Sequence, residues 1–266
     1  MRYRCAVSVA NELGEMDSSR TRLRERAQLV AQANNWLLWE PSGEATEPPA
    51  DEIDVLLKLD AQGWSARWMP EPKWKPLRFD YAHPAFRRRL AKVGPRAETL
   101  IKALGRRRPE RILDCTGGAG EESLLFSAYG AQVHMVERDP VLAILIADAL
   151  ARANAIDDAA LNAIALLCSS EILHSPAVGD GFDVVYCDPM FPVREKSALV
   201  TKTMQFFHCL LGPPQDAADL VEAALGVAKH RVVVKRPAKA PCVLSHRQPD
   251  QQIQNKAVRF DIYLTK

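Results

Sequence analysis

From residue 111 onward the chain alternates between short apolar runs and longer segments whose apolar residues recur at helical spacing. Five runs indicate buried strands, at residues 111–115, 132–137, 165–168, 182–187 and 231–235. Four intervening segments indicate helices, at residues 121–128, 141–153, 196–211 and 217–228. Apolar and polar side chains alternate over residues 258–264, which predicts a closing strand near the sheet edge. This order predicts an α/β fold with a doubly wound parallel sheet, whose ligands bind beyond the carboxyl ends of the strands.

Residues 1–80 follow a different pattern and predict a small α/β unit of their own. Its expected elements are a strand, an amphipathic helix and a hairpin, at residues 3–9, 18–34, and 53–59 with 64–69. A proline-rich stretch at residues 69–76 indicates an extended linker. We therefore predict three parts: a small N-terminal α/β domain (1–80), a basic helical connector (81–110) and a larger domain (111–266).

The predicted connector concentrates positive charge. Helices are expected after Pro84 and over residues 96–104. Between Arg87 and Arg111 the chain has ten Lys or Arg residues against two Glu, a local net charge of +8 in a chain of net charge +2. Such a block suits phosphate groups, although a solvated helix face would have the same composition. Its candidate phosphate contacts are Arg87, Arg88 and Arg89.

Composition excludes several classes of protein. Apolar residues make up 47% and charged residues 26% of the chain, as in ordinary soluble globular proteins, and no apolar run is long enough to span a membrane. The six cysteines are scattered, with no C-x-x-C pair and no His at metal-ligand spacing. We therefore expect reduced thiols in a cytoplasmic protein, with no metal and no membrane partner.

The strand at residues 182–187 is followed by Asp188-Pro189-Met190-Phe191-Pro192. The Asp188 carboxylate and a main-chain carbonyl near Pro189 can accept hydrogen bonds from an exocyclic amino group, while Phe191 stacks on the ring that carries it. Two such acceptors aim the nitrogen lone pair outward, as an amino-group methyltransferase requires. A simple Asp-Pro turn would have the same local sequence, so the motif alone leaves both interpretations open.

The first strand of the larger domain leads into the segment Asp114-Cys115-Thr116-Gly117-Gly118-Ala119-Gly120. Its glycines permit a tight turn and close approach of a ligand to backbone amides. Glu137 ends the next strand about 20 residues later, where an acid can hold ribose hydroxyls. The Asp114 anion disfavours a pyrophosphate and favours a cation, such as the ammonium or sulfonium of S-adenosylmethionine (SAM). The segment also lacks the third glycine of the dinucleotide fingerprint, so SAM fits better than a nicotinamide cofactor.

Two further strand ends carry polar residues. Ser169 and Ser170 follow the third strand, where an adenine edge would lie, but a hydroxyl-capped turn explains them equally well. Lys235 and Arg236 end the fifth strand beside Asp188. They could pair with that carboxylate, contact nucleic-acid phosphate or cap the strand.

Together these segments resemble the bacterial 16S ribosomal RNA guanine-N2 methyltransferases of the RsmJ type. The most specific matches are Asp-Pro-Met-Phe-Pro at residues 188–192 and Lys-Ser-Ala-Leu-Val at residues 196–200. Further matches lie at residues 114–120, 136–140, 231–237 and 259–263. The resemblance covers most of residues 78–266, whereas the first 75 residues match poorly.

The resemblance implies a seven-strand, Rossmann-like methyltransferase fold that uses SAM to methylate the N2 amino group of a guanine. The implied partner is 16S rRNA or the small ribosomal subunit. The implied cofactor contacts lie at Glu121, Glu122, Glu137, Arg138, Ser169, Ser170 and Asp188. Lys196, Lys235 and Arg236 join the arginines of the connector as candidate RNA contacts.

One departure from the family pattern concerns the glycine-rich loop, where Glu121 replaces a basic residue. Three other functions remain open on the sequence. The same fold could methylate another amino group, such as adenine N6 or a protein glutamine. The chain could be a nicotinamide oxidoreductase, or a non-catalytic RNA-binding protein with a degenerate cofactor pocket.

Overall fold

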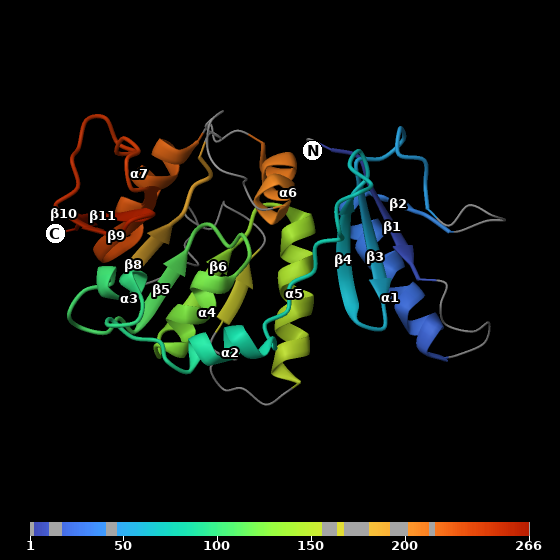
Figure 1. Cartoon of the computed structure of the whole chain (residues 1–266), viewed down its shortest axis with the longest axis horizontal. Helices are drawn as coiled ribbons and strands as arrows, with labels where there is room; N and C mark the ends of the chain where they lie inside the picture. Colours follow the sequence, from blue (N-terminus) through green and yellow to red (C-terminus); the bar gives the residue numbers. More distant parts are fainter. Residues whose placement is uncertain are drawn as a thin grey trace. The chain divides into compact units, whose positions relative to one another are not determined.

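The apolar runs after residue 111 lie side by side in one sheet of the computed structural model, in the order β10-β11-β9-β8-β5-β6-β7 (Figure 1). The structure describes residues 3–10, 18–40, 47–155, 164–167, 181–191, 202–212 and 216–265. The strands are β5 Arg111–Asp114, β6 Gln132–Val136, β7 Ile164–Leu167, β8 Phe182–Cys187, β9 Ala228–Pro237, β10 Gln251–Gln254 and β11 Val258–Leu264.

Strands β5 to β9 pair in parallel, as the alternating pattern predicts. The chain first places β6 and β7 on one side of β5, and then β8 and β9 on the other side. The direction of winding therefore reverses between β5 and β8. This arrangement confirms the predicted doubly wound α/β fold and makes the β5–β8 junction the expected ligand site.

The C-terminal end of the sheet is antiparallel, a direction that the sequence pattern left open for the closing strand. Strand β11 pairs antiparallel with β9, and β10 pairs antiparallel with β11. Only residues 255–257 separate β10 from β11, and a parallel pair needs a crossover of a dozen or more residues. The sequence also gave no sign of β10, because its residues are Gln251-Gln252-Ile253-Gln254 and its side chains are mostly exposed.

The helices of this region follow the predicted ranges closely. They are α2 Pro84–Leu90, α3 Thr99–Ala103, α4 Glu121–Ala128, α5 Pro140–Asn154 and α7 Ala217–Val227. Valines of the central strands, including Val185 and Val232, form a buried core with Val221 and Ala224 of α7. Of the helix predicted at residues 196–211, the structure describes α6, Lys202–Leu211.

The N-terminal segment forms a second sheet with the order β2-β1-β3-β4. Its elements are β1 Cys5–Val9, α1 Ser18–Asn34, β2 Leu37–Leu38, β3 Val55–Asp60 and β4 Gly63–Trp68, and α1 packs against the sheet (Figure 1). The predicted strand, helix and hairpin are confirmed. Strand β2 was not predicted, because two residues are too few to produce a periodic pattern.

The described residues divide into two compact units. One lies within Met1–Asp80, Ile144–Arg152 and Glu195–Gly212, and the other within Tyr81–Ala143, Ala153–Arg194 and Pro213–Lys266. The seven-stranded sheet belongs wholly to the second unit.

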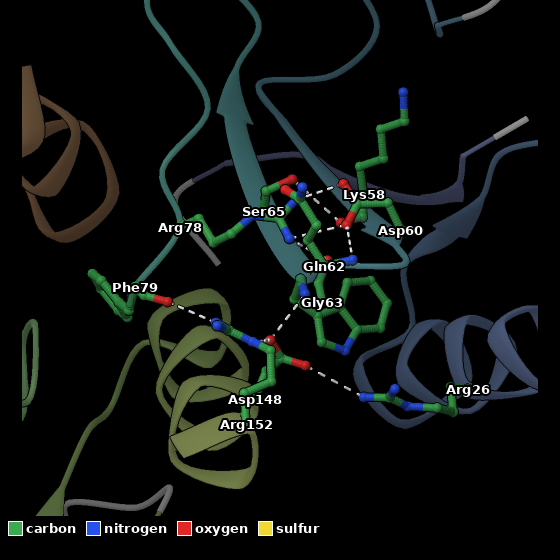
Figure 2. A network of polar contacts seen from close by, with 11 residues as sticks. Arg26, Lys58, Asp60, Gln62, Gly63, Ser65, Arg78, Phe79, Asp148 and Arg152 are labelled. Atoms are coloured by element: carbon green, nitrogen blue, oxygen red, sulfur yellow. Dashed lines mark hydrogen bonds and ion pairs between the residues drawn. The ribbon is translucent and has the colours of Figure 1, made fainter. Parts of the chain in front are cut away.

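The first unit is held by a polar network around the buried Asp148 carboxylate (Figure 2). Its Oδ2 accepts hydrogen bonds from the backbone N–H of Trp64, at 3.1 Å, and from Arg152 Nε, at 2.8 Å. Arg152 also donates from Nη2 to the Phe79 carbonyl, at 2.6 Å. A single buried acid thus connects the hairpin turn at Gly63 to the middle of α5.

Among the described residues, no helix combines the length and the apolar composition needed to cross a membrane. The described cysteines, Cys5, Cys115, Cys187, Cys209 and Cys242, are all free thiols.

Candidate active site

Four neighbouring strands bring charged residues to one edge of the large sheet. Asp114 ends β5, Glu137 follows β6, Asp188 follows β8 and Lys235 lies near the end of β9. Because these strands are parallel, their carboxyl ends meet at the same edge. Three of the predicted catalytic or cofactor residues, Asp114, Glu137 and Asp188, therefore lie with Lys235 at this edge of the sheet.

Asp188 is held from both its backbone and its side chain. Its N–H donates to Thr116 Oγ1 at 2.7 Å, and its Oδ2 accepts from Lys235 Nζ at 2.7 Å. The same ammonium donates to Glu122 Oε1 at 2.8 Å, so it bridges two carboxylates. Among the described residues nothing donates to Asp188 Oδ1.

The electrostatics keep Asp188 mostly ionised at neutral pH. Burial raises the pKa of Asp188 to about 6, with Glu122 adding to the increase and Lys235 opposing it. The two carboxylates in turn raise the pKa of Lys235 above its ordinary value, against the effect of burial. The Lys235 ammonium is therefore the group that counteracts the desolvation of Asp188.

The glycine-rich loop between β5 and α4 folds back onto Glu137. Gly118 and Gly120 have φ of 56° and 74°, in the left-handed region that favours glycine. Gly117 packs so closely that a Cβ there would lie 3.1 Å from Glu137 Cβ. The Gly118 N–H donates to Glu137 Oε2 at 2.7 Å. The loop and the acid thus form one structural element.

Asp114 and Glu137 are both almost completely buried, at 1% and 4% exposure. Asp114 accepts hydrogen bonds from Thr116 N at 3.0 Å and from Ser123 Oγ at 2.7 Å. Glu137 accepts from Asp139 N at 2.8 Å as well as from the loop. Burial raises the pKa of each carboxyl to about 7.

These carboxyls have an excess of negative charge that suits a cationic ligand. Asp114 and Glu137 form no ion pair in the described part of the chain, and Lys235 is shared between Glu122 and Asp188. A ligand that carries an ammonium and a sulfonium would compensate this charge. The donor set and the glycine turn therefore fit SAM.

Phe191 lies beside Asp188 and contacts a cation through its ring. The guanidinium carbon of Arg236 lies 4.0 Å from the centroid of the Phe191 ring. Arg236 also donates from Nε and Nη2 to the Pro241 carbonyl, at 3.0 and 2.7 Å. Pro189, the third predicted catalytic residue, lies between Asp188 and Phe191 in the sequence, and its side chain is buried.

The remaining predicted residues lie at the periphery or outside the described residues. Glu121 is exposed and pairs with Arg89 of α2 at 3.2 Å. Arg89 also pairs with Glu98 at 2.7 Å, and Arg138 pairs with Asp216. Arg88 is exposed and Arg87 half-buried on α2. The residues outside the described part are Ser169, Ser170 and Lys196.

Three residues that the sequence did not single out contribute to the site. Thr116 links the end of β5 to Asp188, and Ser123 donates to Asp114. Tyr81 donates from its hydroxyl to the Ala119 carbonyl at 2.8 Å and packs against Gly120. Thr116 and Ser123 lie in or beside the glycine-rich segment, so that motif could have drawn attention to them. Tyr81 is distant in sequence and has no comparable signal.

Comparisons with known proteins find similar sequences. Residues 45–265 match the family described as "Putative SAM-dependent methyltransferase". A ribosomal RNA small subunit methyltransferase J of Thioalkalivibrio sulfidiphilus (strain HL-EbGR7) is 39% identical over 255 residues, which cover 91% of this chain and 94% of that protein. The corresponding protein of Pseudoalteromonas atlantica (strain T6c / ATCC BAA-1087) is 40% identical, with 79% and 84% covered.

A solved structure is similar over nearly the whole chain. The crystal structure of a SAM-dependent methyltransferase from Neisseria gonorrhoeae has a TM-score of 0.69 and 24% sequence identity, covering 97% of this chain and 95% of that one. At this identity the likeness concerns the fold, and it agrees with the methyltransferase architecture predicted from the sequence.

Proposed function

Because this chain belongs to the ribosomal RNA small subunit methyltransferase J family of SAM-dependent methyltransferases, we propose that it methylates the exocyclic N2 amino group of a guanine in 16S rRNA. The observation that carries the proposal is Asp188, fixed by Lys235 and Thr116 at the reversal of the strand order. The family membership also confirms the predicted resemblance and the dependence on SAM.

The cofactor would be held by residues of the glycine turn and of the neighbouring strand ends. Bound SAM supplies an electrophilic methyl group on a sulfonium, so the protein needs to bind and orient rather than to activate it. In the proposal Asp114 and Asp188 supply negative charge, Glu137 faces the ribose, and the glycines of residues 117–120 allow the ligand to approach the loop closely. The other cofactor contacts proposed are Glu121, Glu122, Arg138, Ser169 and Ser170.

The target amine would be oriented by Asp188 and the Pro189 carbonyl. An exocyclic amino group is a weak nucleophile, because its lone pair is delocalised into the base. An ionised Asp188 can only accept hydrogen bonds, so its Oδ1 would hold one N–H of the amine and aim the lone pair outward. The methylated amine then loses a proton, for which Asp188 is the nearest base in the proposal.

Phe191 would stack on the guanine after the nucleotide has turned out of its RNA helix. Stacking of a base on an aromatic side chain contributes about 1–3 kcal/mol per base, and it leaves the hydrogen-bonding edge of the base free. Phe191 would therefore supply binding energy while Asp188 supplies orientation.

The substrate RNA would be bound in part by the exposed arginines of α2. Arg89 joins α2 to Glu121 at the start of α4, next to the glycine turn, so α2 lies at the edge of the site. The proposed RNA contacts are Arg87, Arg88, Arg89 and Lys196. The proposed domains are residues 1–80 as a small N-terminal domain, 81–110 as a connector and 111–266 as the methyltransferase domain. The protein would act in the cytoplasm on rRNA or on the small ribosomal subunit.

The test uses purified protein, SAM labelled in its methyl group, and small ribosomal subunits from a strain that lacks the enzyme. We expect label in N2-methylguanosine after digestion of the 16S rRNA to nucleosides. Label in a different nucleoside or in protein would refute the proposed acceptor.

Two variants assign the chemistry to Asp188. Asp188→Asn keeps the shape of the side chain but removes its charge, and it should lower turnover at least about a hundredfold, within the range of residues that position a reacting group. Asp250→Asn is the matched control, because this exposed acid lies in the loop before β10. Equal losses in the two variants would show that Asp188 has no special role.

A further inference from the structure

We propose that Arg236 is a positioning residue, which holds Phe191 in the orientation required to stack on the target base. This inference rests on the proposed function, because it assigns the partner of a residue that contacts the substrate there. The guanidinium carbon of Arg236 lies 4.0 Å from the Phe191 ring centroid, a stacked cation–π geometry. The guanidinium lies over one face of the ring, and in the proposal the target base stacks on the opposite face.

Two neighbouring residues of β9 act on the segment that follows β8. Lys235 contacts the Asp188 carboxylate, and Arg236 contacts the Phe191 ring. Successive side chains of a strand point in opposite directions, so one strand can reach both residues from different sides. The acceptor for the amine and the stacking surface for the ring are thereby held by the same strand.

The guanidinium is itself fixed in place. Nε and Nη2 both donate to the Pro241 carbonyl, at 3.0 and 2.7 Å, and the whole residue is only 8% exposed. The planar guanidinium can bond the carbonyl at its edge while its face lies on the ring. A side chain held in this way restricts the rotation of Phe191.

No carboxylate of the described residues forms an ion pair with Arg236. The nearby Asp261 is bonded by Arg259, at 2.7 and 2.9 Å, and Arg236 has no ion pair in the described part of the chain. The Phe191 ring and the Pro241 carbonyl are its described partners. This arrangement favours a role that acts through Phe191 over a contact with RNA phosphate, which needs an exposed cation.

The test is a double-mutant cycle of Arg236→Met and Phe191→Leu, with kcat and KM measured on small subunits at saturating SAM. Arg236→Met alone should lower kcat/KM about tenfold, with unchanged SAM affinity in calorimetry. In the Phe191→Leu background the same substitution should change kcat/KM less than twofold, because Arg236 then has no ring to orient. Arg236→Lys should recover part of the activity.

Arg247→Met is the matched control. Arg247 also stacks on a ring, that of Tyr263 at 5.6 Å, but it makes no contact with Asp188 or Phe191. This variant should keep wild-type kcat/KM, and a tenfold loss in it would overturn the specific role of Arg236.

Other outcomes would also overturn the inference. Additive effects of Arg236→Met and Phe191→Leu, with a shallower salt dependence of RNA binding, would identify Arg236 as a phosphate contact. Wild-type activity of Arg236→Met, when Phe191→Leu and Asp188→Asn lose activity, would overturn only the positioning role. Full activity of all three variants would refute the proposed roles of Asp188 and Phe191, whereas absence of methyl transfer by the wild-type protein would refute the proposed function.

Discussion

Replacement of Lys235 by Met should move the acidic limb of the pH–rate profile to higher pH. Lys235 Nζ lies 2.7 Å from Asp188 Oδ2, and Asp188 must be ionised to accept hydrogen bonds from the amine. Its pKa is about 6, raised by burial and lowered by Lys235. The wild-type kcat/KM should therefore fall as the pH drops through about 6.

The expected shift follows from the ion pair. Two unit charges about 4 Å apart interact by about 4 kcal/mol at an effective dielectric constant of about 20, equivalent to roughly 3 pKa units. Partial exposure of the pair reduces this, and opposite charges at such distances shift a carboxyl pKa by about 1–3 units. With a shift of about 2, the ionised fraction of Asp188 at pH 7 falls from about 90% to about 10%.

The assay is kcat/KM between pH 5.5 and 9.5, which reports ionisations of the free enzyme, the state to which the Asp188 pKa belongs. The kcat/KM of Lys235→Met should be about tenfold lower than that of wild type at pH 7, and it should approach the wild-type value at pH 9.5. Lys235→Arg keeps the positive charge, so the acidic limb of its pH–rate profile should stay near pH 6. Lys229→Met, on the same strand, is the control for loss of a cation.

A loss of rate by the same factor at every pH, with the limb unmoved, would refute this reasoning. It would mean that Lys235 acts on structure or on RNA binding and not on the ionisation of Asp188. Calorimetric titration with SAM across the same range separates a change in turnover from a change in cofactor affinity.

Three further outcomes test the structure. Gly120→Ala should destabilise the protein by about 1–2 kcal/mol in urea and weaken SAM binding, because Gly120 has φ of 74° and a Cβ would lie 2.5 Å from the Tyr81 hydroxyl. Gly63→Ala should also destabilise, since its φ is 103° and a Cβ would lie 2.2 Å from Asp148 Oδ2, but SAM affinity should stay at the wild-type value. Burial raises the pKa of Glu137 to about 7, so its contribution to stability is fully present below about pH 4 and is lost as the pH rises through 7. Glu137→Gln should flatten this part of the pH dependence of the unfolding free energy, and unchanged slopes would contradict the assignment.

Local patterns in the sequence determined most of the fold. The periodicity after residue 111 predicted β5 to β8, α4, α5 and α7 to within one or two residues, and β9 to within three. It failed at β10, where the edge strand has polar, exposed residues and no apolar alternation. Strand order and direction depend on which runs pair, and the apolar pattern of a single run contains no information about its partner.

In the site, too, the sequence predicted some residues, whereas the roles of others became clear only from the structure. Asp188, Glu137 and the glycine-rich loop were evident because each lies at the end of a predicted strand, where α/β proteins bind ligands. For Lys235 the sequence left three roles open, and the structure pairs it with Asp188 and Glu122, which lie 47 and 113 residues away.

By itself, the sequence determined most of the elements, the family and the residue types available for the chemistry, because these depend on neighbours along the chain. Only the tertiary structure decided which charges meet. The bridge at Lys235 and the contact of Arg236 with Phe191 exist because β8 and β9 pair in register at their carboxyl ends. Ion pairs and stacked rings act over a few ångströms, so their formation depends on the packing of strands that are remote in sequence.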